Sequence, residues 1–169
     1  MADQTVDATI EVTGTFDGAG GRFVAGPELG DGGQSEGQDA TFELADGAAL
    51  TNVILGVHCL GSCTLRDVTR EDVGEDAATF TGSGATVLVE GGSAAKGTDK
   101  VCQDNRLAGG SVTIRDFAVS DFGKALTGAG ADDIGLCDIF EGDDTGDEPT
   151  KIGSEPDGVT CVAEGVTVE

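Results

Sequence analysis

A chain of 169 residues with 29 glycines, 4% aromatic residues and no tryptophan or tyrosine does not resemble a helical bundle, because apolar runs with a period of 3.6 residues are missing. The 32 acidic residues against 9 basic ones give a formal net charge of −23, and no basic stripe is present to meet nucleic-acid phosphates. No apolar run reaches the length that spans a bilayer, so we expect neither nucleic acid nor a membrane as partner.

The charge indicates a protein adapted to high salt. Self-repulsion at −23 destabilises a compact chain at low ionic strength, whereas in molar salt the Debye length falls to roughly 3 Å and the repulsion is screened. We therefore expect a halophilic protein, with an acidic, calcium-binding surface protein as the alternative. The opening residues MADQTVDAT are typical of a mature N-terminus, which predicts a secreted protein whose leader has been removed.

Short apolar stretches divided by glycine and polar residues predict strands along the chain. The stretch 8–16 (ATIEVTGTF) predicts an opening strand, and the glycine-rich stretch 17–37 predicts a loop. Towards the end, 141–158 predicts a long acidic surface loop and 160–169 predicts a closing strand. We expect these elements to form one all-β domain over residues 1–169.

A five-residue phrase recurs through the middle of the chain as ALTNV, TLRDV and TIRDF, and more loosely as TVLVE. The second residues of these phrases are predicted to occupy one structural slot: Leu50, Leu65, Val87 and Ile114. Steps of roughly 20–30 residues with one short strand each are typical of a solenoid whose turns stack on one another. The step from Leu50 to Leu65 is only 15 residues, so we expect part of a turn to be missing there.

Polar residues recur in the same register. Asn52, Asp67 and Asp116 each stand fourth in their phrase. We expect them at the turns between faces of the solenoid, where Asx side chains hydrogen-bond the backbone. The apolar residues that we expect to stack inside are Val53, Ile54, Val68, Val73, Val119 and Phe122.

The chain has five cysteines: Cys59, Cys63, Cys102, Cys137 and Cys161. This odd number leaves at least one unpaired if the protein is a monomer, which is the state we expect. The spacing suggests two bridges, Cys59–Cys63 and Cys137–Cys161, without fixing them. A zinc site formed by His58, Cys59 and Cys63 is the alternative, although a second pair of metal ligands is not evident.

Several ordered motifs resemble the class III pectate lyase family. The run REDVGEDAATF at 70–80 is similar to that family's signature, whose typical form is close to W-E-D-V-G-E-D-A. Segments 30–56, 96–105 and 112–124 resemble further family segments in the same order, and 137–161 resembles the family's C-terminal loop. The resemblance covers most of the chain. It implies a right-handed, single-stranded parallel β-helix that cleaves polygalacturonate or low-methoxyl pectin by calcium-assisted β-elimination.

The resemblance also implies a calcium site in the acidic run that begins at Glu71. Asp72, the carbonyl of Val73 and Glu75 would bind Ca²⁺, and Asp76 is assigned both to the metal and to the substrate cleft. Calcium takes several oxygen ligands, which carboxylates and backbone carbonyls supply. The alternative is an acidic turn on an already acidic surface.

Three further residues are implied in the reaction. Lys100 matches the lysine of the family's D-K-x-x-Q-x-N segment and would act as the base, for which it needs a lowered pKa. Lys124 would pair with a substrate carboxylate, and Glu36 would line the cleft. Each of the three also fits an ordinary surface residue, and His58 fits a structural, hydrogen-bonded histidine.

Two departures from the family pattern bear on activity. A P-A-A-D-G stretch that contributes a calcium-binding aspartate is absent between Gly56 and Val57, and Thr127 stands where the family has an arginine. Losing one donor that stabilises developing negative charge costs about 10²–10³ in rate. We therefore predict a pectate lyase, with a non-enzymatic β-helix that binds acidic polysaccharide or calcium as the alternative.

Overall fold

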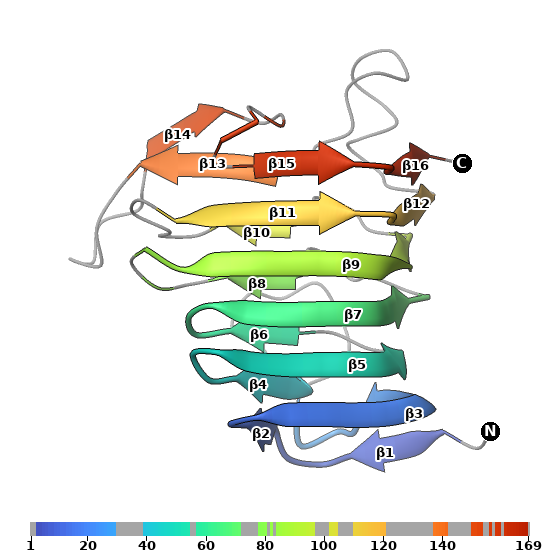
Figure 1. Ribbon diagram of the computed structural model, residues 1–169. Coiled ribbons are helices and arrows are strands. Elements are labelled where there is room, and N and C mark those ends of the chain that lie inside the picture. Colours follow the sequence, from blue (N-terminus) through green and yellow to red (C-terminus); the bar gives the residue numbers. More distant parts are fainter. Residues whose placement is uncertain are drawn as a thin grey trace.

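In a computed structural model, the chain forms a stack of β-coils (Figure 1). The structure describes residues 3–29, 39–54, 57–71, 78–80, 82, 84–96, 102–104, 110–120, 137–141, 150–153, 156, 158–159 and 161–168. Every regular element within these residues is a strand. The described residues contain no helix long and apolar enough to cross a membrane.

Two sheets run along the stack. The 9-stranded sheet contains β1 (Gln4–Val6), β3 (Thr15–Ala25), β5 (Ala48–Ile54), β7 (Cys63–Arg70), β9 (Thr86–Ala95), β11 (Ser111–Arg115) and β15 (Cys161–Glu164), together with β12 (Ala118–Ser120) and β16 (Thr167–Val168). The 7-stranded sheet contains β2 (Ile10–Val12), β4 (Phe42–Leu44), β6 (Val57–Cys59), β8 (Ala78–Phe80), β10 (Cys102–Asp104), β13 (Cys137–Glu141) and β14 (Thr150–Gly153). From β1 to β11 successive strands alternate between the sheets, so each of these coils contributes to both.

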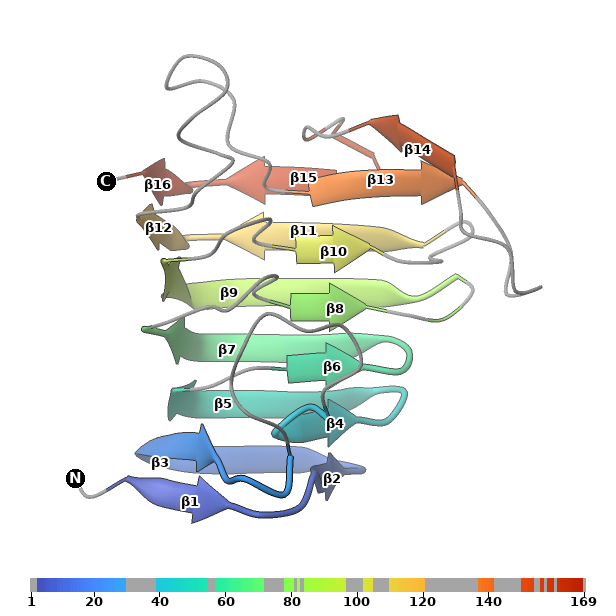
Figure 2. The same ribbon diagram turned by 180° about the vertical axis from the view of Figure 1, so that it is seen from behind.

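The strand directions make this a right-handed parallel β-helix, as predicted. All described strand pairs are parallel except β13 with β14. In Figure 1 the strands β5, β7, β9, β11 and β15 of the 9-stranded sheet run to the right in front as the stack rises towards the C-terminus. In Figure 2, seen from behind, the short strands β6, β8 and β10 also run to the right, so they run leftward in the first view. A chain that climbs while turning in this sense is a right-handed coil.

The register corrects one predicted slot. Leu50 lies opposite Leu65, as expected, but Leu65 lies opposite Val89 rather than Val87. Val89 in turn lies opposite Ile114. Because side chains alternate with a period of two along a strand, this shift of two residues leaves both valines facing the core. The repeated phrase therefore predicted the correct face of the strand but the wrong pairing.

The 15-residue step from Leu50 to Leu65 is a complete coil. The chain passes from β5 through β6 to β7, and both β5–β7 and β4–β6 are paired in register. The expectation of a missing part of a turn is wrong, because two strands and short connections are enough to close one coil.

A row of bends divides the long strands. The residues opposite one another in this row are Asn52, Asp67, Gly91, Asp116 and Gly165. All have φ between 50° and 67°, in the left-handed region that Asn, Asp and Gly tolerate best. Each of the three Asx residues lies at a bend, as predicted, but the strands on both sides of the bend belong to one sheet. Asn52 Nδ2 donates to the Asp17 side chain, and the expected Asx bonds to the backbone stay a prediction.

The core lies between the two sheets. Among the predicted core residues, Val53, Val68 and Val119 are buried. Ile54 is only half-buried and faces the outside of the coil, because it follows Val53 on the alternating strand. Val73 and Phe122 lie outside the described residues. At the N-terminal end, Phe16, Phe23 and Phe42 pack edge to face, with ring centroids 5.1–5.9 Å apart.

Two stretches expected to be loops contain strands. Most of β3 falls within 17–37, where the pairing with β5 shifts register between Asp17 and Gly21. The glycines and polar residues there form a bulge in a strand, which has the same composition as a loop. β14 falls within the expected acidic loop 141–158, where it pairs antiparallel with β13. The closing strand predicted over 160–169 is confirmed by β15 and β16.

The structure confirms one of the two predicted disulfide bridges. Cys59 and Cys63 form a disulfide across the turn between β6 and β7, with Cα atoms 6.2 Å apart. Both sulfur atoms are therefore engaged, so the alternative zinc site with His58 is wrong. Cys161 is also disulfide-bonded. The side chain of its predicted partner, Cys137, lies outside the described part of the structure, and that pairing stays a prediction.

Charges of opposite sign alternate on the outer face of the 9-stranded sheet. Arg66, Glu90, Arg115 and Glu164 lie opposite one another on successive strands. Arg66 Nε lies 2.9 Å from Glu90 Oε2, and Arg115 Nε lies 2.9 Å from Glu164 Oε2. These exposed pairs link neighbouring coils in the first half of the long strands, before the row of bends.

Candidate functional site

Every site residue predicted from the sequence lies outside the described residues. These residues are Glu36, Asp72, Val73, Glu75, Asp76, Lys100 and Lys124. They belong to four connecting segments of the chain: 30–38 between β3 and β4, 72–77 between β7 and β8, 97–101 between β9 and β10, and 121–136 between β12 and β13. The described strands that flank these segments are the structural basis for judging the site.

The strands that precede three of these segments, β7, β9 and β12, end in register, since Arg70 lies opposite Ala94 and Ala95 lies opposite Ser120. β3 differs, because its last three residues pair with β1 rather than with β5. The segments enter the 7-stranded sheet at strand starts that are also in register, from β4 through β6, β8 and β10 to β13. Parallel strands in register thus bring the ends of distant sequence segments together at one edge of the stack, as in other folds whose sites lie at strand ends.

Arg22 links this edge to the first coil. Its Nη1 lies 2.8 Å from Asp3 Oδ2 and its Nε lies 3.0 Å from Glu71 Oε2. The hydrogen bond that Arg22 donates to Asp3, followed by the negative charges of Asp3 and Glu71, holds the pKa of Arg22 above its ordinary value. Glu71 is thus paired with an arginine, although it opens the acidic run in which calcium ligands are predicted.

Sequence reasoning missed Arg22 because its stretch was interpreted as a loop. Its partners, Glu71 just after β7 and Asp3 ahead of β1, are distant in the sequence, so nothing near Arg22 in the sequence points to a role. The apolar run FVA at 23–25 was the available signal, because short apolar runs between glycines are typical of strands.

His58 lies on the outer face of the 7-stranded sheet. In the sheet register its neighbours are Glu43 on β4 and Thr79 on β8. Desolvation lowers the pKa of His58, the positive charge of Arg70 lowers it further, and Glu43 acts in the opposite direction. Arg70 is itself 6% exposed and ends β7. This arrangement favours a neutral imidazole.

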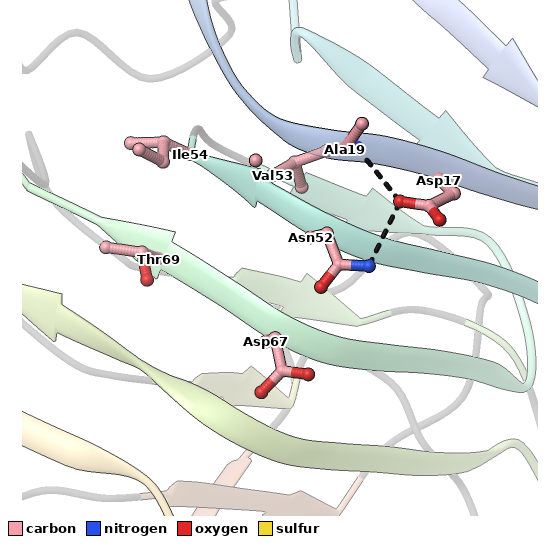
Figure 3. A pocket seen from close by; sticks show the side chains of 8 residues that line it. Asp17, Ala19, Asn52, Val53, Ile54, Asp67 and Thr69 are labelled. Carbon is pink, nitrogen blue, oxygen red and sulfur yellow. Dashed lines mark hydrogen bonds between the residues drawn. The ribbon is translucent and has the colours of Figure 1, made fainter. Parts of the chain in front are cut away.

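A shallow groove lies along the row of bends (Figure 3). It has a volume of about 450 Å³ and is lined by Asp17, Ala19, Gly20, Asn52, Val53, Ile54, Asp67 and Thr69. Asp17 Oδ1 accepts hydrogen bonds from the backbone N of Ala19 at 2.9 Å and from Asn52 Nδ2 at 3.0 Å. These bonds, the backbone one first, lower the pKa of Asp17. Two carboxylates and no basic side chain in this lining make it unsuited to an anionic sugar.

The predicted metal ligands all lie outside the described residues. Within the described ranges, no three His, Cys, Asp or Glu side chains lie close enough to hold a metal ion. Glu71 is the described carboxylate nearest in sequence to the predicted calcium ligands, and it is bound by Arg22.

The sequence of the chain matches a known family over most of its length. The model of the family described as "Pectate lyase" matches residues 1–135. The chain belongs to the pectate lyase family. The resemblance inferred from the sequence motifs is thereby confirmed at the level of the family.

Relatives of this pectate lyase family member include fungal proteins. This chain is 45% identical over 135 residues to "Probable pectate lyase E" of Neosartorya fischeri and to "Pectate lyase E" of Emericella nidulans. Each match covers 75% of this chain and 52% of the relative. It is 42% identical to "Pectate lyase H" of Emericella nidulans, with 50% of that protein covered. The chain therefore spans about half the length of these relatives.

Solved structures with some similarity carry the same name. The pectate lyase Pel3 of Pectobacterium carotovorum has a TM-score of 0.44 and 18% identity, with 98% of this chain and 71% of that chain covered. The catalytic domain of the pectate lyase PelI of Erwinia chrysanthemi has a TM-score of 0.44 and 20% identity, with 99% and 100% covered.

Proposed function

We propose that this chain is a secreted pectate lyase that cleaves polygalacturonate or low-methoxyl pectin by calcium-assisted β-elimination. Its membership of the pectate lyase family over residues 1–135 carries the proposal. Two further observations support it. The strands that precede three of the predicted site segments, β7, β9 and β12, end in register, and the disulfides at Cys59–Cys63 and Cys161 suit an oxidising, extracellular environment.

The donors in segment 72–77 suit Ca²⁺. We assign Asp72, the carbonyl of Val73, Glu75 and Asp76 to the ion, because calcium prefers several hard oxygen ligands with flexible geometry. Glu71 is left out because its carboxylate pairs with Arg22. When bound, the ion supplies positive charge at the uronate carboxylate and makes the proton on the adjacent carbon more acidic.

The reaction then requires a base and a leaving-group bond in one cleft. We assign Lys100 as the base that removes the proton from the carbon next to the carboxylate. The electron pair of that C–H bond forms a carbon–carbon double bond, and the bond from the β-carbon to the glycosidic oxygen breaks. The leaving oxygen keeps the electron pair of that bond and takes a proton from water to become a hydroxyl, while the abstracted proton stays on Lys100. Lys124 binds a substrate carboxylate, and Glu36 and Asp76 line the cleft.

A single substitution pair tests this assignment. Lys100→Gln should lower the formation of unsaturated, ultraviolet-absorbing product from polygalacturonate by about 10²–10⁴-fold, the usual contribution of a general base. Lys96→Gln is the matched control, because Lys96 is an exposed lysine at the end of β9 four residues earlier. Both are assayed with calcium at low and molar salt. If the wild-type chain forms no unsaturated product in any of these conditions, the enzyme proposal fails.

One observation favours a second candidate function. Thr127 stands where the family pattern has an arginine, and a β-helix without that cation would bind acidic polysaccharide or calcium without cleaving it. Retention of polygalacturonate by the wild-type chain without turnover, and to the same extent by Lys100→Gln, would select this second function over the first.

A further inference from the structure

The groove along the row of bends has one wall that an irregularity in β3 creates. In the pairing of β3 with β5, the register shifts between Asp17 and Gly21. Residues 18–20 therefore stand against a single residue of β5, Asn52, and form a bulge. Ala19, in the middle of this bulge, has a φ of 52° and lines the groove. Bulges redirect nearby side chains and are common beside functional sites.

The polar groups in the groove are mainly hydrogen-bond acceptors. Asn52 donates its amide nitrogen to Asp17 Oδ1, and Figure 3 shows its amide oxygen turned away from Asp17. Asp67 lies one strand further along the row, and its carboxylate makes no hydrogen bond with the described part of the chain. Carboxylates only accept hydrogen bonds. A ligand that binds here must therefore supply donors to Asn52 Oδ1, Asp67 and the second oxygen of Asp17.

Apolar surface lies beside these acceptors. Ala19 and Ile54 both line the groove, and Ile54 is a half-buried side chain that faces outward. The volume of about 450 Å³ is typical of small-ligand sites, which combine apolar surface with a few placed polar groups. A sugar ring fits this combination, because its C–H face packs on apolar side chains while its hydroxyls donate hydrogen bonds.

The charge of the groove selects against ions of both signs. Of the eight described residues that line it, two are acidic and none is basic. A uronate carboxylate would therefore meet Asp17 and Asp67 without a compensating cation, and like charges in contact are unfavourable. A metal ion is not accommodated either, because no three His, Cys, Asp or Glu side chains of the described residues lie close enough to hold one.

We propose that this groove binds a neutral, hydroxyl-rich saccharide. Asn52 and Asp67 accept hydrogen bonds from its hydroxyls, and Ile54 packs against the ring. This role goes beyond the proposed lyase function and does not rest on it, because the groove consists of described residues of β3, β5 and β7 and includes none of the residues assigned to the reaction.

The test uses two probes that differ in charge. The full chain, labelled with ¹⁵N, is titrated with a tetramer of 1,4-linked galactose while its amide resonances are recorded by nuclear magnetic resonance. The amides of Ala19, Gly20, Asn52 and Thr69 should shift and saturate. A galacturonate tetramer of the same linkage, which has a carboxylate in place of each CH₂OH group, should leave them in place. Equal shifts with both tetramers would overturn the proposal, because the groove would then not distinguish neutral from acidic sugars.

A matched pair of variants locates the contact. Asp67→Gly removes the carboxylate and should weaken galactose binding by about 3–10-fold, which corresponds to the net value of one hydrogen bond. Glycine suits this position, since Gly91 occupies the next place in the row with a φ of 67°. Asp116→Gly is the control, because Asp116 has nearly the same φ, 50° against 51°, and lies on the row outside the groove. It should leave binding unchanged. Unaltered binding by Asp67→Gly, or equal weakening by both variants, contradicts the assignment.

Salt distinguishes a neutral ligand from a cationic one. Binding of the galactose tetramer should not weaken from about 0.1 M to about 1 M sodium chloride, because screening acts on interactions between charges. Spermidine is the cationic probe. If spermidine shifts the groove amides and the galactose tetramer does not, the groove is a site for organic cations and the proposal is wrong.

This inference and the proposed lyase function fail separately. Lys100→Gln should bind the galactose tetramer as wild type does, although it should lose lyase activity. If the galactose tetramer moves no groove amide in the wild-type chain, the groove proposal falls whatever the lyase assay gives. If the wild-type chain forms no unsaturated product but binds the galactose tetramer, the lyase proposal falls and the groove proposal stands.

Discussion

At the residue scale, His58 has an environment that comes from three different strands. It lies on β6, its register neighbour Glu43 is on β4, and Arg70 ends β7. Desolvation and Arg70 together outweigh Glu43 and lower the pKa of His58 below its ordinary value of 6.5. The folded protein therefore resists protonation of His58 more than the unfolded chain does.

This shift predicts a loss of stability on acidification. As the pH falls through 6.5, the unfolded chain binds a proton at His58 before the folded protein does, so the contribution of His58 is present above that pH and is lost towards the lowered pKa. His58→Gln should lose less thermal stability than wild type between about pH 8 and pH 5. Thermal unfolding followed by circular dichroism at several pH values measures this. Parallel losses in the two proteins would show that His58 does not contribute.

The site residues illustrate how far sequence alone reaches. Lys100 and Asp72 were identified by resemblance to a family motif, which needs no knowledge of packing. Arg22 carries no such motif, and the carboxylates that it binds are distant along the chain. Only the stacking of coils places the three side chains together, so local patterns hold no information about the contact.

At the element scale, the row of bends controls how each long strand turns. Gly92 lies beside this row in β9, opposite Val68 of β7, with a φ of 88°. A Cβ atom built there would lie 2.1 Å from the carbonyl oxygen of Val68. Gly47, in the turn before β5, has a similar φ of 77° but nothing within 4 Å of the same atom.

Alanine substitutions at Gly47 and Gly92 distinguish the cost of backbone strain from the cost of a steric clash. Gly47→Ala should lower the free energy of unfolding by about 1–2 kcal/mol, the cost of a left-handed conformation for a residue with a Cβ. Gly92→Ala should lower it by about 1–3 kcal/mol more, because the neighbouring strand must also move. Urea unfolding of both variants gives the comparison. Equal losses would contradict the close approach of β7 to Gly92.

The elements were predicted unevenly for physical reasons. The phrases around Leu50, Leu65 and Ile114 predicted strands correctly, because inward apolar residues alternate with polar ones there. Composition was misleading over 17–37, because a strand with a bulge needs the same glycines as a loop. The register of Val87 was wrong because a shift of two residues preserves the alternation on which the prediction depends.

At the scale of the whole molecule, repulsion among the acidic residues, whose excess gives a net charge of −23, is the dominant long-range interaction. Ion pairs such as Arg66–Glu90 and Arg115–Glu164 offset it only locally, between adjacent strands. Salt weakens these exposed pairs, but it also screens the repulsion among all the acidic residues. Because the repulsion involves many more charges, the second effect should prevail.

We therefore expect the melting temperature to rise with sodium chloride from about 10 mM to about 1 M, over which the Debye length falls from roughly 30 Å to roughly 3 Å. Thermal unfolding across this range measures the effect. Arg66→Gln, which removes one exposed pair, should show the same rise. A melting temperature that falls steadily with salt would mean that the ion pairs outweigh the repulsion.

The 15-residue coil is the unit by which the chain can be lengthened or shortened while the sheets stay in register. Phe16, Leu50 and Leu65 occupy matching positions on successive strands. Excising Leu50 through Thr64 would bring Leu65 beside Phe16 and β8 beside β4, with inward residues still inward in both sheets. Insertions and deletions of whole coils therefore leave the remaining architecture intact, whereas the gain or loss of a single residue within a strand turns its apolar side chains to the solvent.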